Sequence, residues 1–177
     1  IHISNKSTYN FLKTLLDWSK SEEGNIKLKK EPLQLYDLTQ KSISPYLVMS
    51  EEKEIKIEIC IDKEDLIFGD KYTIENAIGN IFNNAIKFSQ KGDSIWIYSE
   101  KNDTHIKLII KDDGVGMTEK QLESIFKIEG NESTLGTNNE SGSGLGLLLA
   151  KEFIKKNNGD IFVSSTLNCG SSFGIRL

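Results

Sequence analysis

The chain has 177 residues, enough for one domain with a full hydrophobic core and a smaller appendage. Its hydrophobic fraction of 37% and charged fraction of 27% are ordinary for a soluble globular protein. A net charge of −4 and a pI near 5.3 leave no basic surface for nucleic acid, so DNA or RNA binding is not expected.

The cysteines and histidines exclude two further classes of protein. Cys60 and Cys169 have no CxxC spacing, and His2 and His105 are the sole histidines, so neither a disulfide framework nor a zinc site is predicted. Reduced thiols suggest the cytoplasm. No apolar run approaches the roughly 20 residues that a membrane span needs, and no signal peptide is recognisable. Because Ile1 is not a natural start, we expect a fragment of a longer protein, which has room for a membrane anchor elsewhere.

Apolar residues recur at helical spacing from Ser7 to Ser19, and Gly24 is a natural helix stop after them. An amphipathic helix ahead of the main domain needs something to cover its apolar stripe. Two interpretations stay open. The stripe packs on a partner helix, such as a second copy of itself, or it folds back onto the domain.

Three elements are expected between residues 27 and 61. The stretch KLKKEPLQLY at 27–36 indicates a linker entering an edge strand, and a helix capped by Asp37 is predicted to run to about Ser50. Isoleucines at 55, 57, 59 and 61 then alternate with Lys56, Glu58 and Cys60, which predicts a half-buried strand.

The most informative stretch is the helix predicted over Tyr72–Ser89. One face is apolar, and the other carries Asn76, Asn80, Asn84 and Lys87. Asparagine is a poor helix former because its side chain competes with the backbone, so such a row costs helix stability. An amide oxygen can ligate Mg²⁺ and a nearby lysine can neutralise phosphate, which indicates one wall of a nucleotide and metal site. The alternative is an Asn-rich solvated face.

Two strands, Ser94–Glu100 and Thr104–Lys111, are predicted to form a hairpin, with His105 exposed on the second. The sequence DDGVGM at 112–117 follows. Its glycines at i and i+2 allow a ligand to approach the backbone closely, and Asp112 at the strand end points into the turn. By itself this pattern is a weak functional signal.

A capping box of Thr118 and Gln121 predicts a short helix ending near Phe126. From Lys127 to Ser141 there is no apolar periodicity, and we expect a mobile loop of the kind that forms functional lids. The glycines in Gly142–Gly146 then crowd the start of another helix. Backbone N–H groups converge on an anion at such a place, so a phosphate cradle is predicted.

The chain closes with strands over Asp160–Thr166 and Ser171–Leu177, joined around Asn168-Cys169-Gly170. There are no internal repeats or low-complexity segments. The order of elements predicts an α+β two-layer sandwich in which helices cover one face of the sheet.

In this order and spacing, NAIGNIFNNAIKFS, DDGVGM, IF and GSGLGL, ending in GSSF, resemble the N, G1, F and G2 boxes of the ATP-binding domain of sensor histidine kinases, within the GHKL ATPase superfamily. The resemblance covers essentially the whole chain. The ending Lys87-Phe88 is characteristic of the kinases rather than of the gyrase, chaperone or mismatch-repair branches. Ahead of it, LLDWSKSEEGNIKL resembles the second helix of the dimerisation and phosphoacceptor domain. The resemblance implies the end of that domain over 1–24 and a Bergerat-type fold, with a mixed, mostly antiparallel sheet, over 25–177.

The resemblance also implies a role for each matched residue. Asn84 and Asn80 would hold Mg²⁺, and Asn80 and Lys87 would act at the phosphates. Asp112 would accept a hydrogen bond from the adenine amino group. The other matches are Gly114 and Gly116 in the adenine pocket, Phe126 as the anchor of the lid, and Gly142, Gly144, Leu145, Gly146 and Leu147 at the phosphates.

The activity so implied uses ATP and Mg²⁺ to phosphorylate a histidine on a dimerisation and phosphoacceptor domain, in cis or in trans, for relay to a response regulator receiver domain. It implies a cytoplasmic fragment, without membrane contact, of a homodimeric parent that has room for a membrane anchor. Two alternatives stay open: a degenerate nucleotide-binding or interaction module, and an ATP-hydrolysing GHKL ATPase. The hydrolysing relatives carry a glutamate at the Asn80 position, and an amide cannot act as a general base, which favours the kinase.

The chain departs from the family pattern at two places. The acceptor histidine is missing, because His2 precedes the predicted first helix without an acidic neighbour and His105 is expected on a strand. Between Lys127 and Lys151 there is no lysine or arginine, so phosphate charge would rest on Mg²⁺, Lys87 and backbone N–H groups. We therefore expect that the isolated chain does not phosphorylate itself.

Overall fold

The computed structural model describes residues 28–127, 135–138, 140 and 144–177. The helix predicted over Ser7–Ser19, the division of the chain into 1–24 and 25–177, and most of the loop predicted over Lys127–Ser141 therefore lie outside the described residues. Within the described ranges, no helix is long and apolar enough to cross a membrane.

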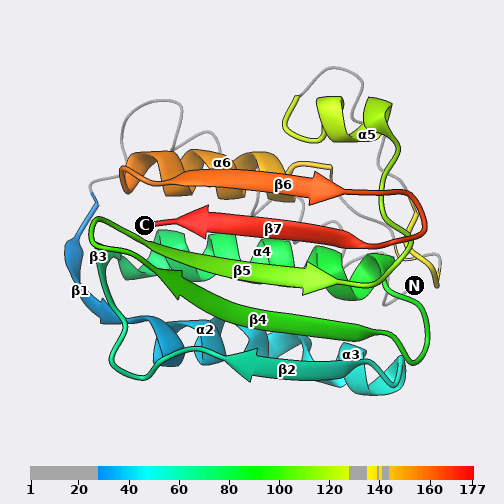
Figure 1. The fold of residues 1–177 in the computed structure, drawn as a ribbon, viewed down its shortest axis with the longest axis horizontal. Helices are drawn as coiled ribbons and strands as arrows, with labels where there is room; N and C mark the ends of the chain where they lie inside the picture. The colour runs from blue at the N-terminus through cyan, green and yellow to red at the C-terminus, as the bar shows by residue number, and fades with distance from the viewer. Residues whose placement is uncertain (1–27, 128–134, 139, 141–143) are drawn as a thin grey trace, which may run out of the picture.

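A five-stranded sheet forms one layer, and helices cover one of its faces (Figure 1). The strand order is β2-β4-β5-β7-β6, with β2 parallel to β4 and the other neighbours antiparallel. The predicted two-layer α+β sandwich with a mixed, mostly antiparallel sheet is confirmed. The strands are β2 (Lys56–Cys60), β4 (Ser94–Lys101), β5 (Ile106–Asp112), β6 (Asp160–Ser165) and β7 (Ser171–Arg176).

The helix layer consists of α2 (Leu35–Ile43), α4 (Lys71–Phe88) and α6 (Gly146–Lys156), with α4 between the other two (Figure 1). At one end of the molecule, β1 (Lys30–Gln34) and β3 (Leu66–Asp70) form a separate antiparallel pair. Buried aliphatic and aromatic side chains from both layers make one continuous core.

Alternation along β5 decides which way its last residue faces. Ile106, Leu108 and Ile110 are buried against the helices, while Lys111 is exposed on the other face of the sheet. Asp112 is in phase with the buried set, so its carboxylate lies on the helix side of the sheet, at the strand end.

The helix predicted from Asp37 to Ser50 was wrong in two respects. Gln34 occupies the N-cap position without a side-chain hydrogen bond, and Asp37 lies inside the first turn of α2. The helix is also interrupted at Pro45, where a 3₁₀ turn (η1, Ser44–Tyr46) separates α2 from α3 (Leu47–Glu52). Proline lacks the N–H that would continue the helical ladder, which accounts for the break.

Other sequence-based expectations hold with small shifts. The hairpin of β4 and β5 is confirmed, but β5 begins at Ile106 because the side-chain oxygen of Asn102 accepts the N–H groups of Thr104 and His105, both at 3.0 Å. His105 therefore lies half-buried in the turn rather than on the strand. The capping box of Thr118 is present on α5 (Glu119–Ser124), and β6 and β7 form the predicted hairpin.

Asn157 ties the end of α6 to the start of α4. Its side-chain oxygen accepts the N–H of Asp70 at 2.7 Å, and its amide group donates to Thr73 Oγ1 at 2.9 Å and to the Phe153 carbonyl at 2.8 Å. Asp70 in turn caps α4 by accepting the N–H of Thr73 at 2.9 Å. The buried amide thus gives the Asp70 N–H a partner and joins the first turn of α4 to the last turn of α6.

We predict that Asn157→Ala lowers the free energy of unfolding by about 1–3 kcal/mol, because it leaves buried donors and acceptors unsatisfied. Chemical denaturation measures this change. Asn158→Gly is the matched control, because Asn158 is exposed and already has a positive φ of 67° that glycine adopts freely. Equal stability of the two variants would contradict the role given to Asn157.

Candidate functional site

Asn80 and Asn84 lie half-buried on the strip of α4 that the core leaves uncovered. The amide of Asn76 donates to the Tyr72 carbonyl at 2.7 Å, whereas no described residue hydrogen-bonds to the side chain of Asn80 or Asn84. A Cβ atom placed on Gly146 would lie 3.1 Å from Asn80 Oδ1, so the first turn of α6 stands directly against Asn80. The predicted N and G2 boxes are therefore brought together.

Asp112 is 2% exposed, and its Oδ1 accepts the backbone N–H groups of Gly114 and Ser171, each at 3.1 Å. No described residue donates to its Oδ2. The pKa of Asp112 is raised to about 6, chiefly by burial; the two backbone hydrogen bonds oppose the rise, and the nearby charges of Asp113 and Asp93 contribute to it. At neutral pH the carboxylate is mostly ionised, with one oxygen available to a further donor.

The turn after Asp112 is wedged between the end of α4 and the turn joining β6 to β7. The Val115 N–H donates to the Phe88 carbonyl at 3.0 Å, and the Val115 carbonyl accepts the Asn168 N–H at 2.8 Å. A side chain at Gly114 would strike the Phe88 carbonyl. Gly116 has a φ of +62° and lies against the Thr166 carbonyl, so a side chain there would be both strained and blocked.

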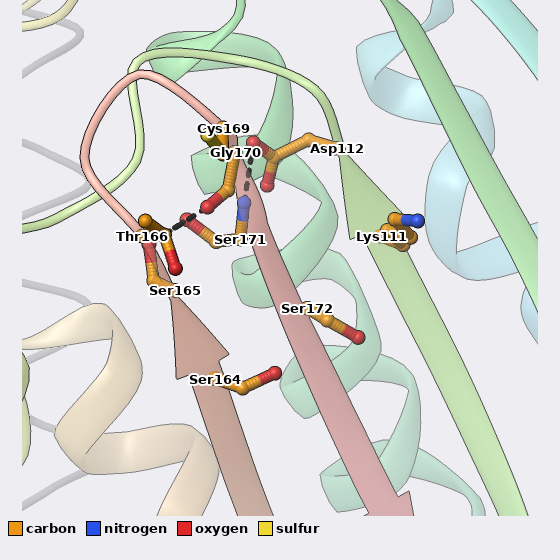
Figure 2. A pocket seen from close by; sticks show the side chains of 9 residues that line it. All are labelled: Lys111, Asp112, Ser164, Ser165, Thr166, Cys169, Gly170, Ser171 and Ser172. Atoms are coloured by element: carbon orange, nitrogen blue, oxygen red, sulfur yellow. Dashed lines mark hydrogen bonds between the residues drawn. The ribbon is translucent and has the colours of Figure 1, made fainter.

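Serine hydroxyls support this turn from the strand hairpin behind it. Ser165 Oγ accepts the Met117 N–H at 2.8 Å, donates to the Gly170 carbonyl at 2.8 Å and lies 3.0 Å from Ser171 Oγ. Figure 2 shows Ser165, Gly170 and Ser171 near Asp112, where they line a shallow pocket of about 140 Å³. The motif GSSF contains Ser171, but its spacing did not indicate that the Ser171 backbone holds Asp112.

Lys87 is 7% exposed. Its position on the polar face of the predicted helix did not indicate that it would be buried. Its ammonium lies 4.9 Å from the centre of the Phe88 ring. A Cβ at Gly136 would lie 2.5 Å from Lys87 Cγ, so the segment around Gly136 covers this side chain. Burial lowers the pKa of Lys87, while the Glu140 carboxylate opposes that shift and Lys53 adds to it.

The remaining predicted residues lie around the start of α6. The ammonium of Lys151 is 4.7 Å from the centre of the Phe126 ring, so a cation stacks on the aromatic residue that was expected to anchor the lid. Gly144 has a φ of +70°, Leu145 is the N-cap of α6, and Leu147 packs against the core. Gly142 lies outside the described residues.

These features define a class of protein. A glycine turn with a buried acid, a row of amides on the central helix and a glycine-rich helix start converge at one end of a two-layer sandwich, as in the Bergerat-type ATP-binding domains. Across the described ranges, no three His, Cys, Asp or Glu side chains cluster in a way that could hold a metal ion. The side chains of Asn80 and Asn84 carry oxygen atoms of the kind that Mg²⁺ binds.

The chain belongs to the family described as histidine kinase-, DNA gyrase B- and HSP90-like ATPases, whose model matches residues 69–177. It is 30% identical over 169 residues to the autoinducer 2 sensor kinase/phosphatase LuxQ of Vibrio vulnificus, covering 92% of this chain and 20% of LuxQ. It is 30% identical over 166 residues to the signal transduction histidine-protein kinase BarA of Escherichia coli, covering 90% of this chain and 18% of BarA. The chain thus spans about a fifth of the length of these relatives.

Solved structures show the same fold. Full-length ShkA, solved in complex with AMPPNP, aligns with a TM-score of 0.81 at 20% identity, covering 98% of this chain and 36% of that one. The histidine kinase AdeS of Acinetobacter baumannii aligns with a TM-score of 0.76 at 22% identity, covering 94% of this chain and 75% of that one. The family and the fold expected from the four boxes are confirmed.

The raised pKa of Asp112 predicts a dependence of stability on pH. Since the carboxyl has a pKa of about 6 when folded and 3.8 as its ordinary value, the folded state binds the proton more tightly. Relative to Asp112→Asn, the wild-type free energy of unfolding should rise as the pH falls through 6, by up to about 3 kcal/mol at pH below 3.8. Denaturation of both proteins at several pH values measures the difference. Parallel profiles would show that Asp112 titrates normally.

Proposed function

We propose that this chain is the ATP-binding catalytic part of a sensor histidine kinase. The observation that carries the proposal is the contact between Asn80 and the start of α6. It brings Asn80 and Asn84, whose amides are engaged by no described residue, to a glycine-rich helix start. Family membership and the sensor kinase relatives support ATP as the nucleotide. The activity of the whole protein is part of the proposal, because the chain covers a fifth of those relatives.

In this proposal Asp112 recognises adenine. Its Oδ1 is already used by two backbone N–H groups, and its Oδ2 is the acceptor for the exocyclic amino group. Gly114 and Gly116 shape the pocket by letting the turn pack against the Phe88 and Thr166 carbonyls, where a side chain would clash. The Ser165 and Ser171 contacts hold the acid and the turn in register before any ligand arrives.

The phosphates lie, in this proposal, between the amides of α4 and the start of α6. Oxygen ligands suit Mg²⁺, and the side chains of Asn80 and Asn84 fit such a role because no described residue engages them. A bound Mg²⁺ would neutralise phosphate charge. The backbone at Gly144, Leu145, Gly146 and Leu147 faces the same region at the positive end of a helix dipole, and Lys87 supplies the cation on α4.

The residue at position 80 favours a kinase over a hydrolase. An amide cannot remove a proton from water, so Asn80 can orient a phosphate or a metal but cannot activate a water molecule for attack. Positioning and charge neutralisation supply most of the catalysis in phosphoryl transfer, and the site offers both. The transfer acceptor in this proposal is a histidine on a dimerisation and phosphoacceptor domain, reached in cis or in trans.

The proposal extends to the surroundings of the chain. Residues 1–24 would be the end of the dimerisation domain and 25–177 the catalytic domain, in a homodimeric parent that passes the phosphoryl group to a response regulator receiver domain. We place the fragment in the cytoplasm, with no role for nucleic acid. The full-length relatives support this setting in general terms.

We predict that Asp112→Asn weakens ATP binding about tenfold or more, because a charge-assisted hydrogen bond to the adenine amino group becomes a neutral one of worse fit. Isothermal titration calorimetry with Mg²⁺ measures the affinity. Asp103→Asn is the matched control, since Asp103 is exposed at the opposite end of β5. Unchanged affinity in Asp112→Asn would remove Asp112 from adenine recognition, and no ATP binding by the wild type would favour a degenerate module.

We also predict that the isolated chain forms no phosphohistidine. His105 is held in a turn by Asn102 and Thr104, at the opposite end of β5 from Asp112, where its ring cannot approach the phosphates. Incubation with labelled ATP should give no acid-labile label, and addition of a fragment carrying the acceptor helix should restore transfer. Acid-labile label that disappears in a His2→Ala variant would show that the acceptor has been misplaced.

A further inference from the structure

Lys53, for which the sequence suggested no role, is a buried cation at the centre of a hydrogen-bond cluster. It is the residue at which α3 ends, and it is 5% exposed. Its ammonium donates to the backbone carbonyls of Ile86, Lys87 and Ser89 at 2.9, 3.2 and 3.2 Å. A buried charge is tolerated when it is paired and hydrogen-bonded, so these contacts are what allow a lysine here.

The carbonyls that Lys53 engages belong to the C-terminal turn of α4. The last carbonyls of a helix have no partner within it, and they carry the negative end of the helix dipole. A cation there stabilises the turn and fixes its position. This turn directly follows Asn84 and contains Lys87, so Lys53 holds the part of α4 that faces the proposed phosphate site.

The same ammonium reaches the segment that covers Lys87. It lies 2.6 Å from Glu140 Oε1 and donates to Thr137 Oγ1 at 2.8 Å. Thr137 is also bonded to α4 directly, since its N–H donates to the Lys87 carbonyl at 3.0 Å and its hydroxyl to the Ser89 carbonyl at 2.6 Å. Lys53 therefore joins the end of α4 to Thr137, which lies 84 residues from Lys53 along the chain.

Glu140 completes the cluster in its ionised form. Its Oε2 accepts the N–H of Asn138 at 2.8 Å, and its carbonyl accepts the N–H of Gly136 at 3.0 Å. Partial burial opposes ionisation of Glu140, but the hydrogen bond from Lys53 and those from backbone N–H groups outweigh it, so its pKa lies below the ordinary value. The negative charge of Glu140 also favours the protonated form of Lys87 and so opposes the lowering of that lysine's pKa by burial.

We propose that Lys53 is a positioning residue for nucleotide phosphates. It anchors Thr137 and Glu140 to the end of α4, and it neutralises the Glu140 carboxylate, which would otherwise place a net negative charge beside the phosphates. The inference rests on the proposed nucleotide site. Without Lys53, the Glu140 carboxylate would be an unpaired anion beside Lys87, which would compete with phosphate for that cation and repel it.

The anchor is tested first without nucleotide, by amide hydrogen exchange. In Lys53→Met and in Glu140→Gln the Thr137 N–H should exchange about tenfold faster or more, because the side chains that hold its segment are lost. Lys56→Met is the matched control, since the Lys56 side chain is exposed and makes no hydrogen bond or ion pair with a described residue. Unchanged exchange at Thr137 in both test variants would contradict the anchoring role of Lys53. If Lys53→Met does not fold, the exchange rate in Glu140→Gln still tests that role.

The electrostatic part is tested by calorimetry with Mg²⁺-ATP and with adenosine. Lys53→Met should weaken ATP binding about tenfold while adenosine affinity changes less than twofold, because the unpaired Glu140 carboxylate repels the charged phosphates and adenosine carries none. Lys53→Arg should retain most of the ATP affinity. Adding Glu140→Gln to Lys53→Met should restore ATP affinity while Thr137 exchange stays fast, since the unpaired carboxylate is gone but the anchor is not rebuilt.

Failure of the Lys53 proposal and failure of the proposed nucleotide site would give different results. Equal losses of ATP and adenosine affinity in Lys53→Met, or no recovery in the double variant, would show a general structural role and overturn the electrostatic one. Absence of ATP binding in the wild type would overturn the proposed function, and the exchange measurement would still decide whether Lys53 anchors the segment.

Discussion

The enclosure of α4 is the constraint on which the site depends. Ten of its residues are buried, with the sheet, α2 and α6 packed against it, and at Gly79 an added Cβ would lie 3.3 Å from the Ser42 carbonyl of α2. A helix packed on three sides cannot rotate about its axis without burying polar groups and exposing apolar side chains. Summed over several residues, the free-energy cost of such a rotation is comparable to the stability of a domain. The orientation of Asn80 and Asn84 toward the start of α6 follows from that packing. Core and site are therefore specified by opposite faces of the same helix.

Much of the architecture could be predicted from local pattern. Helical spacing located α4 and α6, alternation located β2, β4 and β5, and the glycine turns located the ends where ligands approach, because these signals reside in neighbouring residues. The break at Pro45 was available in the sequence, and it was overlooked because the apolar residues on either side keep a helical spacing. β3 was missed for a different reason. Leu66 and Phe68 are exposed, so the strand shows no alternation of apolar and polar residues, and its existence depends on pairing with β1.

The parts of the site that sequence could not supply are contacts between distant segments. Lys53 looks like a surface lysine at a helix end, and nothing near it in the chain indicates burial. Its partners lie in the last turn of α4 and in residues 137 and 140. The depth of Lys87 has the same origin, since the segment that covers it is distant in sequence. Family motifs name residues that touch a ligand, whereas residues such as Ser165 that hold those residues in place become visible when the chain is folded.

The position of β7 has a consequence for how the domain forms during synthesis. β7 is the last strand of the described chain to leave the ribosome, yet it lies inside the sheet, paired to β5 on one side and to β6 on the other. Until it emerges, β5 has an open edge and β6 has no partner in the sheet. The Ser171 N–H that holds Asp112 arrives with the same strand. The nascent chain thus keeps unpaired strand edges while the residues between β5 and β7 are made, when pairing with other chains competes with folding, and the nucleotide pocket cannot exist before the sheet is closed.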